Sequence, residues 1–193
     1  MLEDILVSKV RIKMLQHFLL NPRETYHVRE IVRQIDEEIN AVRRELTRME
    51  KAAMVRSEWR ANRRYYEFRR DYLFYHELLA MINKIGGLGG EIIRNKPKLG
   101  KIKFAFISVG FARGRAPHPQ EVELLLVGNI VLPELAAIVK SEEIKRDREI
   151  NYTVMTEEEY KFRVTKRDPF ILAVLERPRI MLIGDEEQLL ADV

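Results

Sequence analysis

The stretch from Asp36 to Arg70 constrains the fold most, because two structural patterns follow one another within it. In its first half, apolar residues recur at alternating intervals of three and four positions. They are Ile39, Val42, Leu46, Met49 and Ala53. This spacing predicts an amphipathic α-helix over residues 37–52. The opposite face of that helix carries polar and basic side chains, namely Asn40, Arg43, Arg44, Thr47, Arg48 and Lys51.

The second half of the stretch is predicted to form a β-hairpin over residues 55–69. Two short strands, 55–59 and 64–68, flank Ala61 and Asn62, and asparagine tolerates the left-handed conformation that a tight turn requires. Seven basic residues against two acidic ones give the segment Lys51 to Arg70 a net charge of +5, in a chain whose total is +4. The basic residues are Lys51, Arg56, Arg60, Arg63, Arg64, Arg69 and Arg70. A cationic helix face followed by a cationic hairpin suits a nucleic-acid duplex.

Two further helices are predicted ahead of this stretch. Apolar residues at helical spacing indicate one from Val7 to Leu20, ended by Asn21 and Pro22, with Arg11 and Lys13 on its solvated side. A shorter helix is expected over residues 26–35. Asp36 is then placed to cap the third helix. Three helices and a hairpin make a winged helix-turn-helix, although a small three-helix bundle with a solvated charged face fits the apolar spacing equally well. The basic hairpin favours the first interpretation.

In that interpretation, helix 37–52 enters the major groove of DNA and hairpin 55–69 lies on the backbone or in the minor groove. The expected DNA-binding residues are Asn40, Arg43, Arg44, Thr47, Arg48, Arg60, Arg63 and Arg64. Asn40, Arg44 and Arg48 would read base edges, while the remaining arginines would bind phosphate. Glu37 and Glu38 do not fit this role, because in the first turn of the helix they would repel phosphate. Trp59 is expected to pack against the core.

Composition narrows the chemistry that the chain can carry out. The absence of cysteine excludes disulfides, thiol catalysis and cysteine-bound zinc. The four histidines are isolated from other metal-binding residue types, so no zinc site is expected. The N-terminus carries acidic residues where a signal peptide carries basic ones, and no apolar run approaches the roughly 18–20 residues that span a bilayer. The expected location is therefore the cytoplasm, without a membrane partner.

Residues 72–98 are expected to connect two domains. The segment from Asp71 to Ile85 has the apolar spacing of a helix. It is followed by Gly86, Gly87, Gly89 and Gly90, and glycines at this density predict a break or hinge before a short helix that ends near Ile93. Such a helix could mediate dimerisation or pack on the next domain, and the sequence leaves both open.

From Lys101 onward, strands alternate with helices, which is typical of an α/β layer structure. The predicted strands are 102–109, 122–127, 150–155 and 179–183, with 122–127 as the buried centre of a mixed sheet. A helix is expected over 133–139, and others are expected to begin at the caps Thr156, Asp168 and Asp185. The predicted fold class is α+β, with domains at 1–71 and 99–193 joined by the connector 72–98.

Two motifs in the second domain resemble the nucleotidyltransferase superfamily. They are Phe111-Ala112-Arg113-Gly114 and the segment from Glu121 to Gly128, EVELLLVG. Members of that family carry Gly-Ser, then Arg-Gly, then Asp-x-Asp at the start of an apolar strand. The resemblance implies nucleotide binding at Gly110, Arg113 and Gly114, and two acids that hold Mg²⁺.

The chain departs from the family pattern at the residues that carry the chemistry. Val109 and Gly110 replace Gly-Ser, and Glu121 and Glu123 replace the two aspartates. Each glutamate is longer by a methylene, and a misplacement of about 1 Å can lower a rate on the order of 100-fold. We therefore expect a domain that is not catalytic and uses no cofactor. If it were active, Glu121 and Glu123 would be the catalytic and metal-binding residues, with Mg²⁺ and a nucleoside triphosphate bound.

The whole chain resembles bacterial and archaeal transcriptional regulators in which an ArsR-like winged helix-turn-helix is fused to a nucleotidyltransferase-like domain. The likeness is carried by AVRRELTRMEKAAMV, the hairpin through Arg64-Tyr65-Tyr66, FARG, ELLLVG, EINYTVMTEEEY and DPFILAVLERPRIMLIGDEEQL. It implies a regulator that binds double-stranded DNA, and we expect a homodimer. What such a regulator responds to does not follow from the resemblance, and a small-molecule or nucleotide effector is one possibility. Two alternatives remain open: an active Mg²⁺-dependent nucleotidyltransferase acting on a protein or RNA, and an antitoxin-like protein whose basic hairpin contacts a protein.

Overall fold

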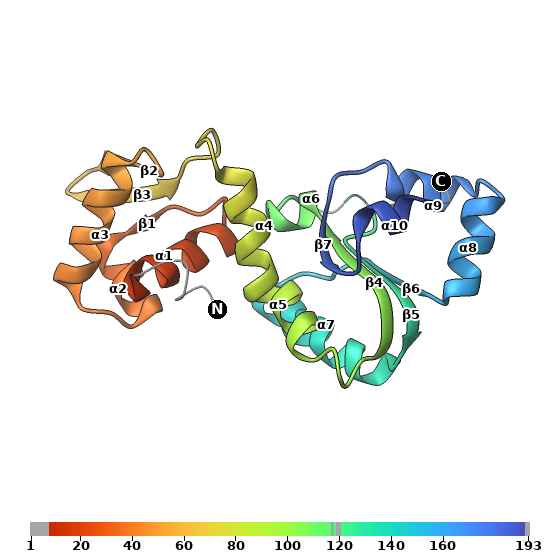
Figure 1. Ribbon diagram of the computed structural model, residues 1–193. Helices are drawn as coiled ribbons and strands as arrows, with labels where there is room; N and C mark the ends of the chain where they lie inside the picture. The colour runs from red at the N-terminus through yellow and green to blue at the C-terminus, as the bar shows by residue number, and fades with distance from the viewer. Residues whose placement is uncertain (1–7, 117, 119–120, 192–193) are drawn as a thin grey trace. The chain divides into compact units, whose positions relative to one another are not determined.

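The computed structural model of the chain describes residues 8–116, 118 and 121–191 (Figure 1). The chain divides into two compact units, Met1–Ile82 and Asn83–Val193. The first contains a three-stranded sheet and the second a four-stranded mixed sheet, so the fold is of the predicted α+β class. Among the described residues, no helix combines the length and apolar character needed to cross a membrane.

The first unit begins with helix α1, Lys9–Leu20, which buries Met14, Leu15 and Phe18 as predicted. The predicted start at Val7 lies outside the described residues. Neither Arg11 nor Lys13 is simply solvated, contrary to expectation. Arg11 forms an ion pair with the buried Glu45, and Nζ of Lys13 donates to the carbonyl of Ile35 at 3.0 Å.

The helix expected over residues 26–35 starts two residues later than predicted, because Tyr26 and His27 form strand β1, Tyr26–His27. They pair with Tyr66 and Tyr65 of the later hairpin, and this long-range pairing holds the backbone extended. Helix α2, Val28–Ile35, follows directly. Nδ1 of His27 accepts a hydrogen bond from the backbone N–H of Glu30 at 3.0 Å, so the histidine caps α2.

Helix α3, Ile39–Lys51, confirms the predicted amphipathic helix, with Val42, Leu46 and Met49 buried. Ala53 does not continue the stripe as expected, since it lies beyond the helix with a φ of 56°. The prediction that Asp36 caps α3 is wrong. Asp36 ends α2 in the left-handed conformation, and its N–H donates to the carbonyl of Val32.

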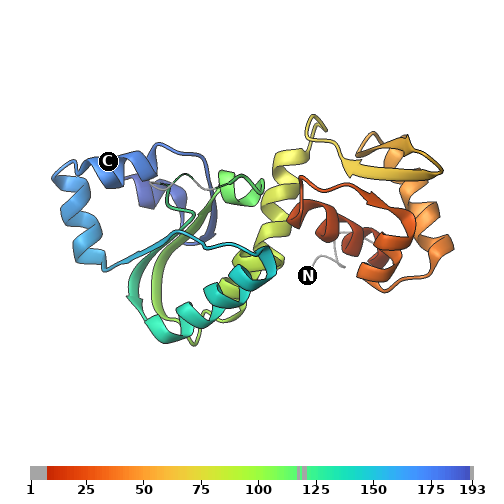
Figure 2. The same ribbon diagram turned by 180° about the vertical axis from the view of Figure 1, so that it is seen from behind.

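The predicted hairpin is present as β2, Val55–Arg60, and β3, Arg63–Phe68. The sheet order is β1-β3-β2, and all pairs are antiparallel (Figure 2). At the turn, Ala61 has the positive φ of 52°, a conformation that the sequence predicts for Asn62. Register places Ser57 opposite Tyr66 and Trp59 opposite Arg64, so these four side chains share one face of the hairpin.

Helix α4, Tyr75–Ile85, and helix α5, Gly87–Arg94, are separated at Gly86, which confirms the predicted break. Helix α4 begins at Tyr75 and not at Asp71. The glycines that follow allow close packing. A Cβ on Gly89 would lie 2.2 Å from the carbonyl oxygen of Asn83, and one on Gly90 would lie 2.7 Å from the carbonyl oxygen of Ile85.

The sheet of the second unit has the order β6-β5-β4-β7. Its strands are β4 Gly100–Ser108, β5 Leu124–Ile130, β6 Tyr152–Met155 and β7 Arg179–Ile183. Strands β5 and β6 are parallel, and the other two pairs are antiparallel. Residues 124–127 have no exposed surface, which confirms β5 as a buried strand.

Helices cover both faces of this sheet (Figures 1 and 2). They are α5, α7 Leu132–Arg146, α8 Glu157–Thr165, α9 Pro169–Leu175 and α10 Glu186–Leu190, while the short α6, Val109–Ala112, directly follows β4. Side chains of α8, α9 and α10 form one apolar cluster with Phe104 and Phe106 of β4 and Leu125 of β5. The caps Thr156, Asp168 and Asp185 are confirmed. Helix α7 runs beyond the predicted end at residue 139.

Candidate functional site

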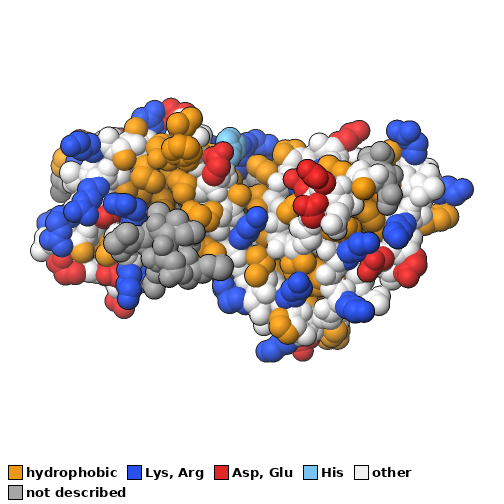
Figure 3. All heavy atoms as spheres, in the orientation of Figure 1, with side chains coloured by type: hydrophobic (Ala, Val, Ile, Leu, Met, Phe, Trp, Pro, Cys, Tyr) orange, Lys and Arg blue, Asp and Glu red, His pale blue; other side chains and the backbone are white. Residues whose placement is uncertain are grey.

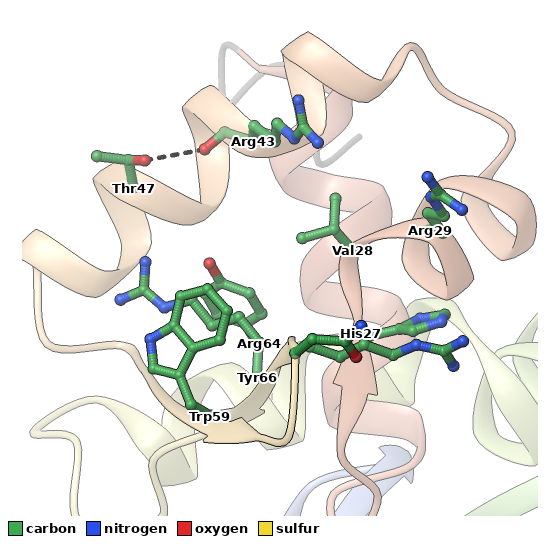
Figure 4. Close-up of a pocket in the computed structure, with 10 residues that line it drawn as sticks. His27, Val28, Arg29, Arg43, Thr47, Trp59, Arg64 and Tyr66 are labelled. Atoms are coloured by element: carbon green, nitrogen blue, oxygen red, sulfur yellow. Dashed lines mark hydrogen bonds between the residues drawn. The ribbon is translucent and has the colours of Figure 1, made fainter.

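An open groove of about 670 Å³ lies in the first unit between α3, the start of α2 and the β2–β3 hairpin. We call it the basic groove. It is lined by His27, Val28, Arg29, Arg43, Thr47, Trp59, Asn62, Arg63, Arg64 and Tyr66. Figure 4 shows Arg43 and Thr47 on α3, across the open space from Trp59 on the hairpin. Figure 3 shows lysine and arginine side chains spread over the visible surface, with acidic side chains among them.

Three exposed arginines of the groove carry charge that no carboxylate of the described residues neutralises. Arg29 begins α2, Arg43 lies on the outer face of α3, and Arg63 lies beside the hairpin turn. Within residues 8–116, 118 and 121–191, no carboxylate forms an ion pair with any of the three. Three guanidinium groups around one groove create a positive potential that attracts an anionic ligand.

Arg64 also lines the groove, but its charge is neutralised by Glu50. Its Nη2 lies 2.8 and 3.0 Å from the two carboxylate oxygens of Glu50, and its Nε donates to Oγ of Ser57 at 2.9 Å. The guanidinium also lies over the ring of Tyr66, 5.3 Å from its centroid. Because Glu50 belongs to α3, this network fixes the hairpin to the helix and sets the width of the groove.

The opposite face of the hairpin is largely neutralised as well. Arg60 forms an ion pair with Glu58, donates to Oγ1 of Thr25 at 3.1 Å and lies over Tyr65. Arg56 forms an ion pair with Glu67. The net +5 of residues 51–70 already counts Glu58 and Glu67. Two further arginines of the segment pair with acids outside it, Arg64 with Glu50 and Arg69 with Asp71, so fewer charges are left unpaired than the net +5 indicates.

The structure places all five predicted α3 residues on the exposed side of the helix. Of these five, Arg43 and Thr47 line the basic groove, whereas Asn40, Arg44 and Arg48 lie outside it. Of the three predicted hairpin residues, Arg63 and Arg64 line the groove and Arg60 does not. Oγ1 of Thr47 donates to the carbonyl of Arg43 at 3.0 Å (Figure 4). Arg48 is 67% exposed, and its Nη1 lies 3.6 Å from the buried carboxylate of Glu45.

The two glutamates at the start of α3 have structural roles that explain their presence. Oε1 of Glu37 lies 2.7 Å from Nζ of Lys13, which joins α1 to the start of α3. Glu38 caps α3, because its Oε2 accepts from the backbone N–H of Ala41 at 2.9 Å. Backbone hydrogen bonds from Asn40 and Ala41 lower the pKa of Glu38. Both carboxylates are therefore occupied within the protein.

Sequence patterns missed three residues of the groove, namely His27, Arg29 and Trp59. Trp59 does not pack on the core as predicted, since its side chain is 70% exposed on the hairpin side of the groove. The strand alternation carried a usable signal, because Trp59 shares a face with Ser57, which turns toward α3. His27 could not be found in this way, because a two-residue strand has no readable period, and Arg29 lies in helix α2, to which strand alternation does not apply.

In the second unit, Glu121 and Glu123 are both paired with arginines. Glu123 is 2% exposed, and its Oε1 and Oε2 accept from Arg148 at 2.7 and 2.8 Å. Its Oε2 also accepts from the backbone N–H of Asn151 at 3.2 Å. Glu121 lies 3.3 Å from Nη1 of Arg177. In the described part of the chain, no group of three or more His, Cys, Asp or Glu side chains is arranged to hold a metal ion.

The turn between β4 and β5 brings Gly110 next to Glu121. A Cβ on Gly110 would lie 2.9 Å from Oε1 of Glu121, so the carboxylate fills the space beside the glycine. Gly114 has a φ of 61°, and Arg113 is half-buried at the end of α6. Mg²⁺ needs carboxylate oxygens that can coordinate it at about 2.0–2.1 Å. In this arrangement Glu123 accepts hydrogen bonds from Arg148 and Glu121 forms an ion pair with Arg177, so the residues present do not fit a Mg²⁺ ion.

Comparisons of the chain with protein-family models, with curated proteins and with solved structures found no match. Its function is therefore inferred from the residues of the two units.

Proposed function

We propose that the chain is a transcriptional regulator whose first unit is a winged helix-turn-helix that binds double-stranded DNA. Helix α3 would enter the major groove, and the β2–β3 hairpin would be the wing that contacts the backbone or the minor groove. The observation that carries this proposal is the basic groove, where Arg29, Arg43 and Arg63 have no acidic partner among the described residues.

The groove suits one sugar-phosphate strand of the duplex. A helix seated in the major groove and a wing in the neighbouring minor groove have one phosphate backbone between them. Arg43 on the helix and Arg63 on the hairpin would bind that backbone from two sides, and Arg29 would add an interaction at the start of α2. Asn40, Arg44 and Arg48 lie outside the groove on the exposed side of α3, where they would reach base edges.

For the second unit we propose a nucleotidyltransferase-like domain without catalytic activity, which senses an effector or joins two copies of the chain. Support comes from Glu121 and Glu123, whose carboxylates are bound by Arg177 and Arg148. The ArsR-like family, a homodimer and a small-molecule or nucleotide effector belong to the same hypothesis.

The test is a triple variant, Arg29→Ala with Arg43→Ala and Arg63→Ala, titrated with a fluorescently labelled random-sequence duplex at several salt concentrations. For every phosphate that the variant no longer neutralises, the slope of log K against log salt should become shallower by about 0.9. Near 0.1 M salt, affinity should fall roughly tenfold for each of these phosphates.

The matched control removes three exposed basic residues of the same unit that lie outside the groove, Lys9, Arg23 and Arg33. It has the same change in net charge and should bind DNA much more tightly than the groove variant does. Equal reductions in affinity in the two triple variants would show that the chain binds DNA through diffuse charge and would refute the proposed interface.

A further inference from the structure

Trp59 presents an apolar surface that folding leaves exposed. Its indole is 70% exposed, although the chain has no other tryptophan and burial of such a side chain is strongly favourable. In the part of the chain that the structure describes, no ring or guanidinium group stacks on it. Across the hairpin, by contrast, Tyr65 is stacked on His27 and covered by Arg60.

The position of Trp59 is fixed by its neighbours. It lies opposite Arg64 in the strand register, and Arg64 is held by Glu50 and Ser57. The indole therefore projects from a hairpin that is anchored to α3. It lines the basic groove together with Arg43 and Arg63, and Figure 4 shows it facing the open space below α3.

An exposed aromatic side chain among cationic groups is the combination that binds nucleic-acid bases. The cations hold the phosphates, and the ring stacks on a base or enters a base step and unstacks it. Because the strand beside Trp59 would be fixed by Arg43 and Arg63, the bases attached to it come within reach of the indole.

Building on the DNA-binding function proposed above, we infer that Trp59 is a base-contacting residue of the hairpin, which stacks on or wedges into the duplex beside the bound strand. This role differs from that of Arg43 and Arg63, which would bind the phosphate backbone of the DNA. It predicts a preference for base steps that unstack easily, such as the pyrimidine–purine step TA, over stiff A-tracts.

The single tryptophan supplies a direct readout. A labelled duplex with a central TA step is titrated into the protein while duplex anisotropy and tryptophan emission are followed together. Stacking should quench the emission in step with the anisotropy increase. Trp59→Ala should lower affinity roughly 5- to 150-fold without changing the salt slope, and Trp59→Phe should recover part of the affinity.

The outcomes separate this inference from the function on which it rests. If anisotropy rises to saturation while the emission stays unchanged and Trp59→Ala binds as the wild type does, the base contact is refuted and DNA binding stands. If Trp59→Ala also reduces the salt slope, the residue acts through phosphate binding and the inference fails. If no duplex raises the anisotropy, both ideas fail.

Discussion

The basic groove of the first unit and the acidic pair of the second differ in what happens to their charges. Arg29, Arg43 and Arg63 keep their charge exposed, without an acidic partner among the described residues. Glu121 and Glu123 are both bound by arginines of their own unit, and Glu123 is almost completely buried. One region offers charge to a partner, whereas the other uses its charge to hold the fold together.

This difference cannot be read from the type of residue. Arg43, Arg63 and the two glutamates were all candidate functional residues on the sequence, because ionisable side chains occurred at suggestive spacings. What separates them is the presence of an opposite charge, which depends on segments distant in the sequence. Arg148 reaches Glu123 across 25 positions, for example. Three substitutions would break or sharpen the comparison.

The largest effect is expected from Glu123→Ala. Removing one partner of a buried ion pair leaves the other uncompensated and costs about 3–5 kcal/mol. The free energy of unfolding of the second unit, measured by urea denaturation with circular dichroism, should fall by that order. The control is Glu121→Ala, whose more exposed pair with Arg177 should contribute at most about 1 kcal/mol. Equal effects of the two substitutions would show that the Glu123 pair does not stabilise the unit more than a surface pair does.

An intermediate effect is expected from Glu50→Gln, which removes the carboxylate that pairs with Arg64. The amide still accepts from Ser57, so the hairpin stays attached while the guanidinium gains net charge. The salt slope of DNA binding should become steeper by up to about 0.9. Glu67→Gln is the control, because it frees Arg56 on the opposite face of the hairpin. A similar change in both variants would contradict the assignment of the groove face to DNA.

The smallest effect concerns Glu38, a carboxylate occupied by backbone N–H groups. Its pKa is lowered from 4.5 by hydrogen bonds from Asn40 and Ala41. The cap therefore stabilises α3 fully above that value, and the contribution disappears as the pH falls through the lower pKa of the folded state. A carbon-detected NMR titration should find the pKa of the Glu38 carboxyl below 4.5, and Glu38→Gln should remove this part of the acid sensitivity. An unshifted titration would rule out the cap.

Much of the fold was predictable because it depends on local patterns. Helical spacing located α1 and α3, and two short strands on either side of Ala61 and Asn62 located the hairpin. Thr156, Asp168 and Asp185 were identified as caps from their residue type. Helix α7 was predicted too short, since the polar residues after Val139 hide its apolar period. They are nevertheless good helix formers, and Arg146 pairs with Glu142 one turn earlier.

The predictions were wrong where contacts with segments distant in the sequence determine the local structure. Tyr26 and His27 are extended because β3 pairs with them, and Trp59 is exposed because the face it shares with Ser57 borders an open groove. Likewise, α2 ends at Asp36 in the left-handed conformation, and Glu38 takes the capping role in α3 that was expected of Asp36. At the candidate site, sequence identified the basic side chains of α3 and the hairpin, but neither Arg29 nor which arginines would be neutralised.

The network of Arg64, Glu50 and Ser57 has a consequence for the rate of binding. Immobilising a flexible side chain on association costs about 0.5–1.5 kcal/mol, and ordering a loop costs more. Here the hairpin is fastened to α3 before any partner arrives, so that ordering accompanies folding. In the proposed complex with DNA, association would then need no rearrangement of the hairpin, and electrostatic steering by Arg29, Arg43 and Arg63 would govern how fast the complex forms.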